Sequence, residues 1–134
     1  MNIMENEVLI APGKYAQFHF EIRSWERLLE FFKQENAYLK NRLSEVLDLR
    51  SDKEFLPLAE HFQNLFIIKD EFMDELRHDI HEQESLLKQV GISARQPADI
   101  KLKKQEKLRN EMEYLERDFI KVKIDFNKYL LSVL

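Results

Sequence analysis

The amino-acid sequence predicts an all-α protein, an elongated up-down-up antiparallel three-helix bundle with coiled-coil-like heptad packing. The chain has only two glycines and three prolines in 134 residues, too few for a turn-rich β fold. It is 44% hydrophobic and 34% charged, a balance typical of long helices with one buried stripe and a wide solvated side. Its apolar residues recur in alternating steps of three and four, which is the heptad repeat.

Residues 1–15 form an N-terminal extended segment in this prediction, ahead of the helical part of a single domain that spans 1–134. Val8, Leu9 and Ile10 make a short apolar run, and Pro12-Gly13 closes it. Because the run is too short for an independent element, we expect it to lie across a helix surface or to form a single strand or turn. The first long helix should therefore begin only after it.

The first helix is predicted at 16–49, with a heptad seam in which one position is polar. An Asn at such a position fixes the register and number of packed helices, at some cost in stability. The alternative is that Asn36 turns to the edge of the bundle and meets water. The seam consists of Phe18, Ile22, Trp25, Leu29, Phe32, Asn36, Leu39, Leu43 and Val46.

The second helix is predicted at 53–90. Ser51 and Asp52 are N-cap candidates, and Pro57 suits a first helical turn, so the regular helix could begin near 55–57. Gly91 suits the position just after a helix end. The seam consists of Phe55, Ala59, Phe62, Phe66, Lys69, Met73, Leu76, Ile80, Gln83, Leu87 and Val90.

The third helix is predicted at 97–132, with Pro97 in its first turn. Both connections are short, so sequential helices should run antiparallel. Folding the chain back at 49–52 sets Asn36 opposite residue 66, and folding it at 91–96 sets residue 82 near residue 105. The acidic side of the second helix then faces the lysine-rich start of the third. The seam consists of Gln105, Leu108, Met112, Leu115, Phe119, Val122, Phe126, Tyr129 and Val133.

Lys69 occupies a seam position close to Asn36 in this register. Beside Glu35 or Glu71 it would complete a polar layer, but the preferred interpretation is a snorkelling side chain that carries its amine to water. Asn36 and Lys69 are therefore the residues predicted to set the register and specificity of helix association.

Charge and composition exclude several classes of protein. The net charge is −4, which is unlike a general nucleic-acid binder, and the absence of cysteine excludes a thiol nucleophile, a Cys-ligated metal and a disulfide framework. No apolar run is long enough to cross a membrane, and the N-terminus carries acids before its short apolar run, unlike a secretory signal. The expected location is cytoplasmic.

One set of residues could hold a metal. Ferritin-like bundles use Glu-x-x-His motifs, and Glu75 with His78 forms one, with His81 and Glu82 nearby. However, Glu75, His78 and His81 fall on outward heptad positions and no second motif occurs, so a solvated charged surface is the preferred interpretation. No Ser/His/Asp arrangement or phosphate-binding loop is present. We therefore expect no enzyme and no cofactor.

The segment Lys101–Arg109 carries five cations in nine residues and is the only candidate for contact with nucleic acid or an anionic surface. No aromatic residue is interleaved in it, so stacking on bases is not suggested. Intramolecular pairing and solvation are the preferred interpretation of these charges.

More apolar side chains are present than the three seams need. A second apolar stripe indicates a further partner, for which the candidates are a second copy of the chain, the N-terminal segment, another helical protein and a lipid-like ligand. Self-association as a homodimer is the preferred interpretation. The sequence thus predicts a non-enzymatic scaffold, adaptor or regulatory subunit. The residues predicted to form its interaction surface are Phe31, Tyr38, Ile67, Ile68, Ile120, Ile124 and Leu131.

Overall fold

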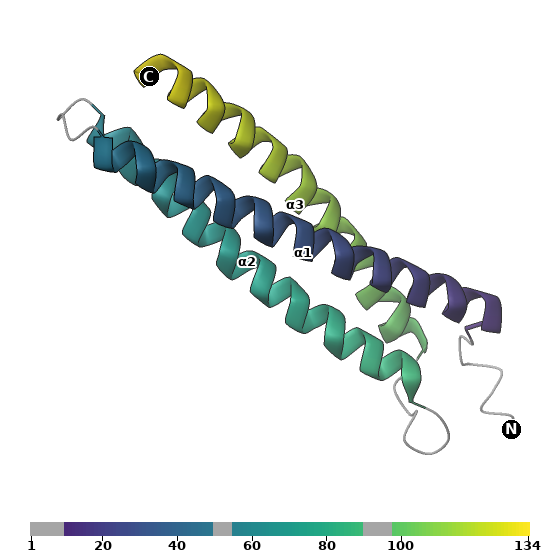
Figure 1. Ribbon diagram of the computed structural model, residues 1–134. Coiled ribbons are helices and arrows are strands. Elements are labelled where there is room, and N and C mark those ends of the chain that lie inside the picture. The colour runs from purple at the N-terminus through teal and green to yellow at the C-terminus, as the bar shows by residue number, and fades with distance from the viewer. Residues whose placement is uncertain (1–9, 50–54, 90–97) are drawn as a thin grey trace, which may run out of the picture.

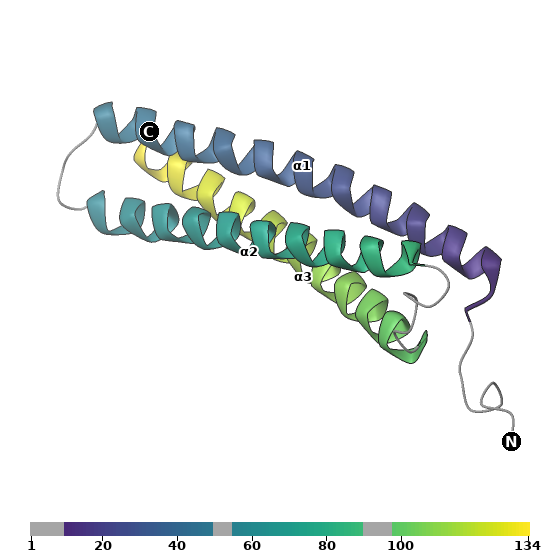
Figure 2. The ribbon, with the colours of Figure 1, turned by 90° about the horizontal axis from the view of Figure 1, so that it is seen from below.

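A computed structural model describes residues 10–49, 55–89 and 98–134, and these ranges contain three α-helices and no strand. The helices are α1 (Pro12–Leu49), α2 (Leu56–Lys88) and α3 (Ala98–Val133). Figures 1 and 2 show α1 and α2 side by side and antiparallel, with α3 inclined across both of them. The C-terminal end of α3 lies near the end of α1 in both views. The predicted three-helix bundle is therefore confirmed.

The core of the bundle consists of the heptad seams. Every predicted seam residue of α1 is buried, and so is every predicted seam residue from Phe55 to Leu87 on α2. On α3 the seam from Gln105 to Tyr129 is buried, while Val133 is only partly covered and Leu130 joins the core. Burial of this continuous stripe stabilises helices that would be marginal alone.

Aromatic rings fill the end of the core where α2 begins and α3 ends. Phe66 and Phe126 meet edge to face with ring centroids 5.1 Å apart, and Phe62 contacts both Phe126 and Tyr129. The Tyr129 hydroxyl donates a hydrogen bond to the Phe55 carbonyl over 3.0 Å. This bond satisfies the one polar group of the cluster and fixes the end of α3 against the start of α2.

The predicted N-terminal segment is partly wrong, because α1 begins at Pro12 rather than at residue 16. Proline is compatible with a first turn, where its missing N–H has no intrahelical partner to lose. The backbone N–H groups of Lys14 and Tyr15 both donate to the Ala11 carbonyl, which shows the helix already formed there. Ile10 packs against the core, as expected of that run, while Val8 and Leu9 lie outside the described residues.

The second helix is shorter than predicted and runs from Leu56 to Lys88. Phe55 precedes it without a side-chain cap, and Pro57 lies in its first turn as expected. The predicted caps Ser51 and Asp52, and Gly91, lie outside the described residues. In the part of the chain that the structure describes, no helix combines the length and apolar character that crossing a membrane requires.

Candidate functional site: buried polar layers and an exposed apolar face

A polar layer crosses the middle of the bundle at Asn36, a fully buried residue with 0% exposure. Its side-chain amide donates to the Phe66 carbonyl over 2.9 Å and to Asp70 Oδ1 over 2.8 Å. Lys40 pairs with Asp70 from the next turn of α1. The predicted position of Asn36 opposite residue 66 is therefore confirmed, and the alternative of an Asn36 turned to water does not hold.

The same layer changes the acidity of Asp70. Desolvation by burial would raise the pKa of this carboxyl, but the hydrogen bonds from Lys40 and Asn36 outweigh it and lower the pKa below its ordinary value. Hydrogen bonds to a carboxylate favour the charged form, so Asp70 stays ionised inside the α1–α2 contact. Lys33 and Asp74 form a more exposed ion pair alongside, with 2.5 Å between Nζ and Oδ1.

Lys69 is 6% exposed and faces α3, where its ammonium pairs with Asp118. The ammonium also lies 5.7 Å from the ring centroid of Tyr114, and burial lowers its pKa. The preferred interpretation of a snorkelling Lys69 is therefore wrong, and so are the alternative neighbours Glu35 and Glu71. Glu35 instead pairs with Lys123 of α3 over 2.8 Å.

A second polar layer lies near the far end of the core, where Gln83 and Gln105 are both fully buried. Gln83 Nε2 donates to the Lys101 carbonyl over 2.9 Å and to Gln105 Oε1 over 3.1 Å. Gln105 Nε2 donates to the Phe18 carbonyl over 3.3 Å. The predicted register of residue 82 near 105 is thus confirmed to within one position.

The charged edge of this layer joins α1 to α3. Arg109 donates two hydrogen bonds of 2.7 Å to the Glu21 carboxylate, and Gln105 donates a third to the same group. The hydrogen bonding from Arg109 is the main reason that the pKa of Glu21 is lowered. Sequence reasoning placed Gln83 and Gln105 in the seams but did not pair them; two glutamines at facing seam positions were the available signal.

Exposed apolar residues gather on the side where α1 and α3 adjoin. Phe31 and Tyr38 lie one turn before and after Glu35, and Ile120 lies one turn before Lys123, so the Glu35–Lys123 pair marks the boundary between two apolar stripes. We call this surface the α1–α3 face. It consists of Phe20, Phe31, Tyr38 and Leu49 on α1, and Ile120, Ile124 and Leu131 on α3.

The remaining two predicted surface residues lie elsewhere. Ile67 and Ile68 are exposed on α2. Ile67 lies three residues before Asp70, which pairs with Lys40 at the contact of α1 with α2, whereas Glu35 lies at the contact of α1 with α3. The predicted interaction surface is thus divided between two sides of the bundle. Phe20 and Leu49 were missed in the sequence; their spacing of eleven residues from Phe31 and Tyr38 was the signal.

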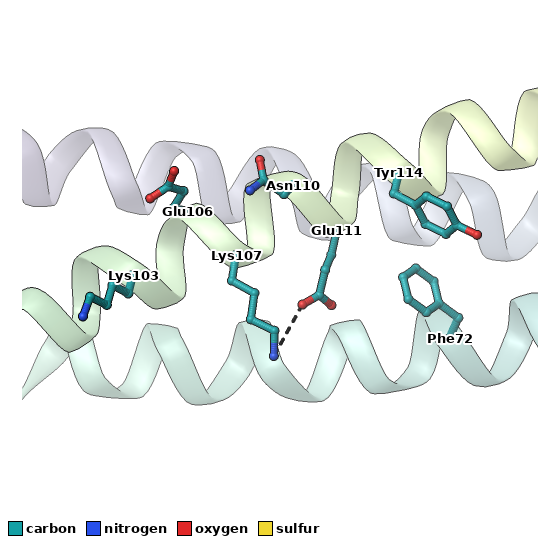
Figure 3. Close-up of a pocket in the computed structure, with 7 residues that line it drawn as sticks. All are labelled: Phe72, Lys103, Glu106, Lys107, Asn110, Glu111 and Tyr114. Carbon is teal, nitrogen blue, oxygen red and sulfur yellow. Dashed lines mark ion pairs between the residues drawn. The ribbon is translucent and has the colours of Figure 1, made fainter.

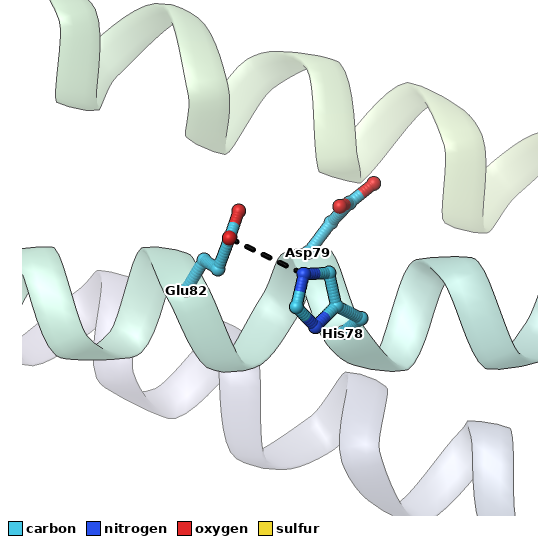
Figure 4. Close-up of side chains that lie close together, drawn as sticks. All are labelled: His78, Asp79 and Glu82. Carbon is cyan, nitrogen blue, oxygen red and sulfur yellow. Dashed lines mark ion pairs between the residues drawn. The ribbon is translucent and has the colours of Figure 1, made fainter.

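The candidate metal ligands lie on the outside of α2, as their heptad positions predict. His78 Nε2 and Glu82 Oε1 form an ion pair at 3.2 Å, with 72% and 56% of their side chains exposed (Figure 4). With Asp79 they could supply three ligand atoms within 4.8 Å of one another, the single such group among the described residues. Glu75 and His81 are also exposed and do not join that group. All three ligands come from one solvated helix face, which cannot form an enclosed dinuclear cage.

The basic segment is less available to an anion than its sequence suggests. Lys101 is 3% exposed with its ammonium 5.9 Å from the Tyr15 ring centroid, and Arg109 is held by Glu21. Intramolecular pairing, which is part of the preferred interpretation, is thus confirmed for Arg109, whereas Lys101 is buried rather than solvated. Lys103 and Lys104 remain exposed.

A shallow hollow of about 540 Å³ lies between α2 and the start of α3 (Figure 3). Phe72 and Tyr114 meet edge to face at one end, and Lys107 lies 3.6 Å from Glu111 farther along. The acidic side of α2 faces the lysines of α3 as predicted, because Asp79, Glu82, Lys104 and Lys107 line one smaller hollow. Among the described residues, however, no ion pair joins an acid of α2 to the segment 101–109.

Comparison with known proteins gives no match: no family model, no curated protein and no solved structure corresponds to this chain.

Proposed function

We propose that this chain is a non-enzymatic helical-bundle protein that mediates protein–protein association as a scaffold, adaptor or regulatory subunit. The proposed partner is a second copy of the chain, held by coiled-coil-like contacts in the cytoplasm. A different helical protein is the alternative occupant of the same surface.

The observation that carries the proposal is the α1–α3 face. The bundle buries its three seams without using these residues, and yet Phe31, Ile120 and Ile124 are about half exposed on adjoining helices. Two exposed apolar stripes on adjoining helices of a small protein favour an interaction site, because their exposure to water costs free energy that a partner would recover.

Light scattering coupled to size exclusion tests the proposal. The wild type should elute as a dimer at micromolar concentration, and Ile124→Glu should shift it to monomer, because a carboxylate buried in the contact would lack a partner. Ile68→Glu is the matched control, since Ile68 on α2 is 55% exposed and Ile124 is 49% exposed. Far-UV circular dichroism should show that both variants keep their helices.

Other outcomes would change the assignment. A shift caused by Ile68→Glu alone would move the association surface to α2. A wild type that stays monomeric at every concentration, and whose binding to other proteins is insensitive to Ile124→Glu, would remove the proposed role of the α1–α3 face.

A further inference from the structure

The apolar residues of α1 that are more than half exposed form a pattern that is the same from either end. Phe20, Phe31, Tyr38 and Leu49 are separated by eleven, seven and eleven residues, and all are between 53% and 77% exposed. These spacings are close to whole helical turns, so the four side chains lie along one line of the helix surface. The centre of the pattern lies between residues 34 and 35.

On α3, Ile120 and Ile124 are centred on Val122, whereas the position that mirrors Leu131 about the same centre is Glu113. The ion pairs that join α1 to α3 show how the two helices are aligned. Glu21 meets Arg109, and Glu35 meets Lys123, with a separation of 88 residues in both pairs. Val122 is therefore level with residue 34 of α1, so the two centres lie at the same height in the bundle.

We propose that the α1–α3 face binds a second copy of this chain around one two-fold axis, which passes between residues 34 and 35 of α1 and beside Val122 of α3. Each helix would then lie antiparallel on its own counterpart. Phe31 would meet Tyr38, Phe20 would meet Leu49, and Ile120 would meet Ile124 of the other copy. This inference rests on the proposed function and specifies its partner and geometry.

Symmetry is the reason to prefer a second copy over an unrelated helix. A two-fold interface uses one surface patch twice, so it requires that each residue find its mate at the mirrored position. The four α1 residues and the Ile120–Ile124 pair meet this requirement about the same level, and Leu131 lies outside the mirrored set. A different protein would place no such condition on the spacing in either helix.

Exposed charges on α3 fit the same arrangement. On α3, Asp125 of one copy would come within about one turn of Arg117 and Lys121 of the other, and none of the three forms an ion pair within the described part of the chain. On α1, the position that mirrors Arg27 is Arg42 of the other copy, whose guanidinium already pairs with Glu45 at 3.5 Å. Opposite charges thus meet at the rim of the contact on α3, where they favour this orientation.

Engineered cysteines test the arrangement directly, because the chain has no cysteine of its own. Phe31→Cys mixed with Tyr38→Cys should form a disulfide between copies under mild oxidation. Phe31→Cys alone should not, because two copies of residue 31 would be offset by seven residues, about 10 Å along the axis. A disulfide needs Cα atoms no more than about 7 Å apart.

The control pairs use the same logic at other positions. Phe20→Cys with Leu49→Cys should crosslink, as should Ile120→Cys with Ile124→Cys, whereas Phe20→Cys with Tyr38→Cys should not. Helix content measured before oxidation shows that each variant is folded.

The outcomes separate this inference from the function on which it rests. A dimer by light scattering that crosslinks through Phe31→Cys alone, or through none of the mirrored pairs, would overturn the antiparallel two-fold arrangement and leave association intact. A strict monomer that binds another protein through the α1–α3 face would overturn the second copy as occupant. A monomer with no association through that face would overturn both.

Discussion

Gln83 on α2 and Gln105 on α3 join two helices through a side-chain hydrogen bond of 3.1 Å, although both side chains are completely buried. Gln83 donates its other N–H to the Lys101 carbonyl, whereas Gln105 accepts through Oε1 and donates its own N–H groups to the Phe18 carbonyl and to Glu21. Gln83 Oε1 has no partner within the described part of the molecule. The layer is therefore almost but not fully satisfied, which makes its response to substitution informative.

Replacing one glutamine should cost more than replacing both. Gln105→Leu leaves the amide of Gln83 with one of its two partners, and a buried polar group without a partner costs about 1–3 kcal/mol of unfolding free energy. The double variant Gln83→Leu/Gln105→Leu should recover most of that loss, because no polar side chain stays behind. Urea unfolding followed by circular dichroism measures the cycle; strictly additive effects would contradict this account.

The Lys69–Asp118 pair should be asymmetric. Asp118→Ala would strand an ammonium in the core and should cost about 3 kcal/mol, whereas Lys69→Met leaves a carboxylate that can reach water and should cost about 1 kcal/mol or less. The asymmetry follows from burial, since the Lys69 side chain is 8% exposed and that of Asp118 is 25% exposed. Equal losses in chemical denaturation would show that Lys69 reaches solvent without Asp118.

Acid should destabilise the bundle partly through Asp70. Its pKa in the folded protein lies below the ordinary value of 3.8, so its contribution to stability is present above that value and is lost as pH falls through the folded pKa. Asp70→Asn should therefore flatten the fall in the unfolding midpoint as the pH drops below about 4. Glu60→Gln, at an exposed position on α2, is the control. Parallel acid profiles for Asp70→Asn and wild type would contradict the assignment.

The protein should bind little metal, and the loss of His78 should leave its unfolding temperature unchanged. His78, Asp79 and Glu82 project from one solvated side of α2, so protein purified without added metal should contain far less than one equivalent of iron, manganese or zinc. Elemental analysis measures this, and His78→Ala should unfold at the same temperature as wild type. A stoichiometric metal that His78→Ala removes would instead support a metal-binding function.

The sequence was sufficient for the helices, their order and nearly all of the core, because the heptad period assigns each residue to a side of its helix. Asn36 shows how far this extends: its seam position and the short connection together placed it opposite residue 66, where its amide meets the Phe66 carbonyl. Both the burial of Asn36 and its position opposite residue 66 could thus be predicted without the tertiary structure.

The missed features depend on the third dimension. Whether Lys69 turns to Glu35 or to Asp118 depends on which side α3 occupies, and a heptad pattern is silent on that choice. The burial of Lys101 beside Tyr15 depends on how the first turn of α1 lies against the start of α3. The α1–α3 face was likewise visible only as surplus apolar residues until the pairing of Glu35 with Lys123 aligned the two helices.

The glutamine layer also limits how the helices can slide. Because the apolar seams repeat every seven residues, α3 could slip by one repeat along α2 and still bury Leu against Phe or Met. Such a slip would move Gln83 and Gln105 about 10 Å apart and bury both amides without each other. Hydrophobic packing alone would tolerate several alignments of these helices. The hydrogen bond between the two buried amides favours one of these alignments.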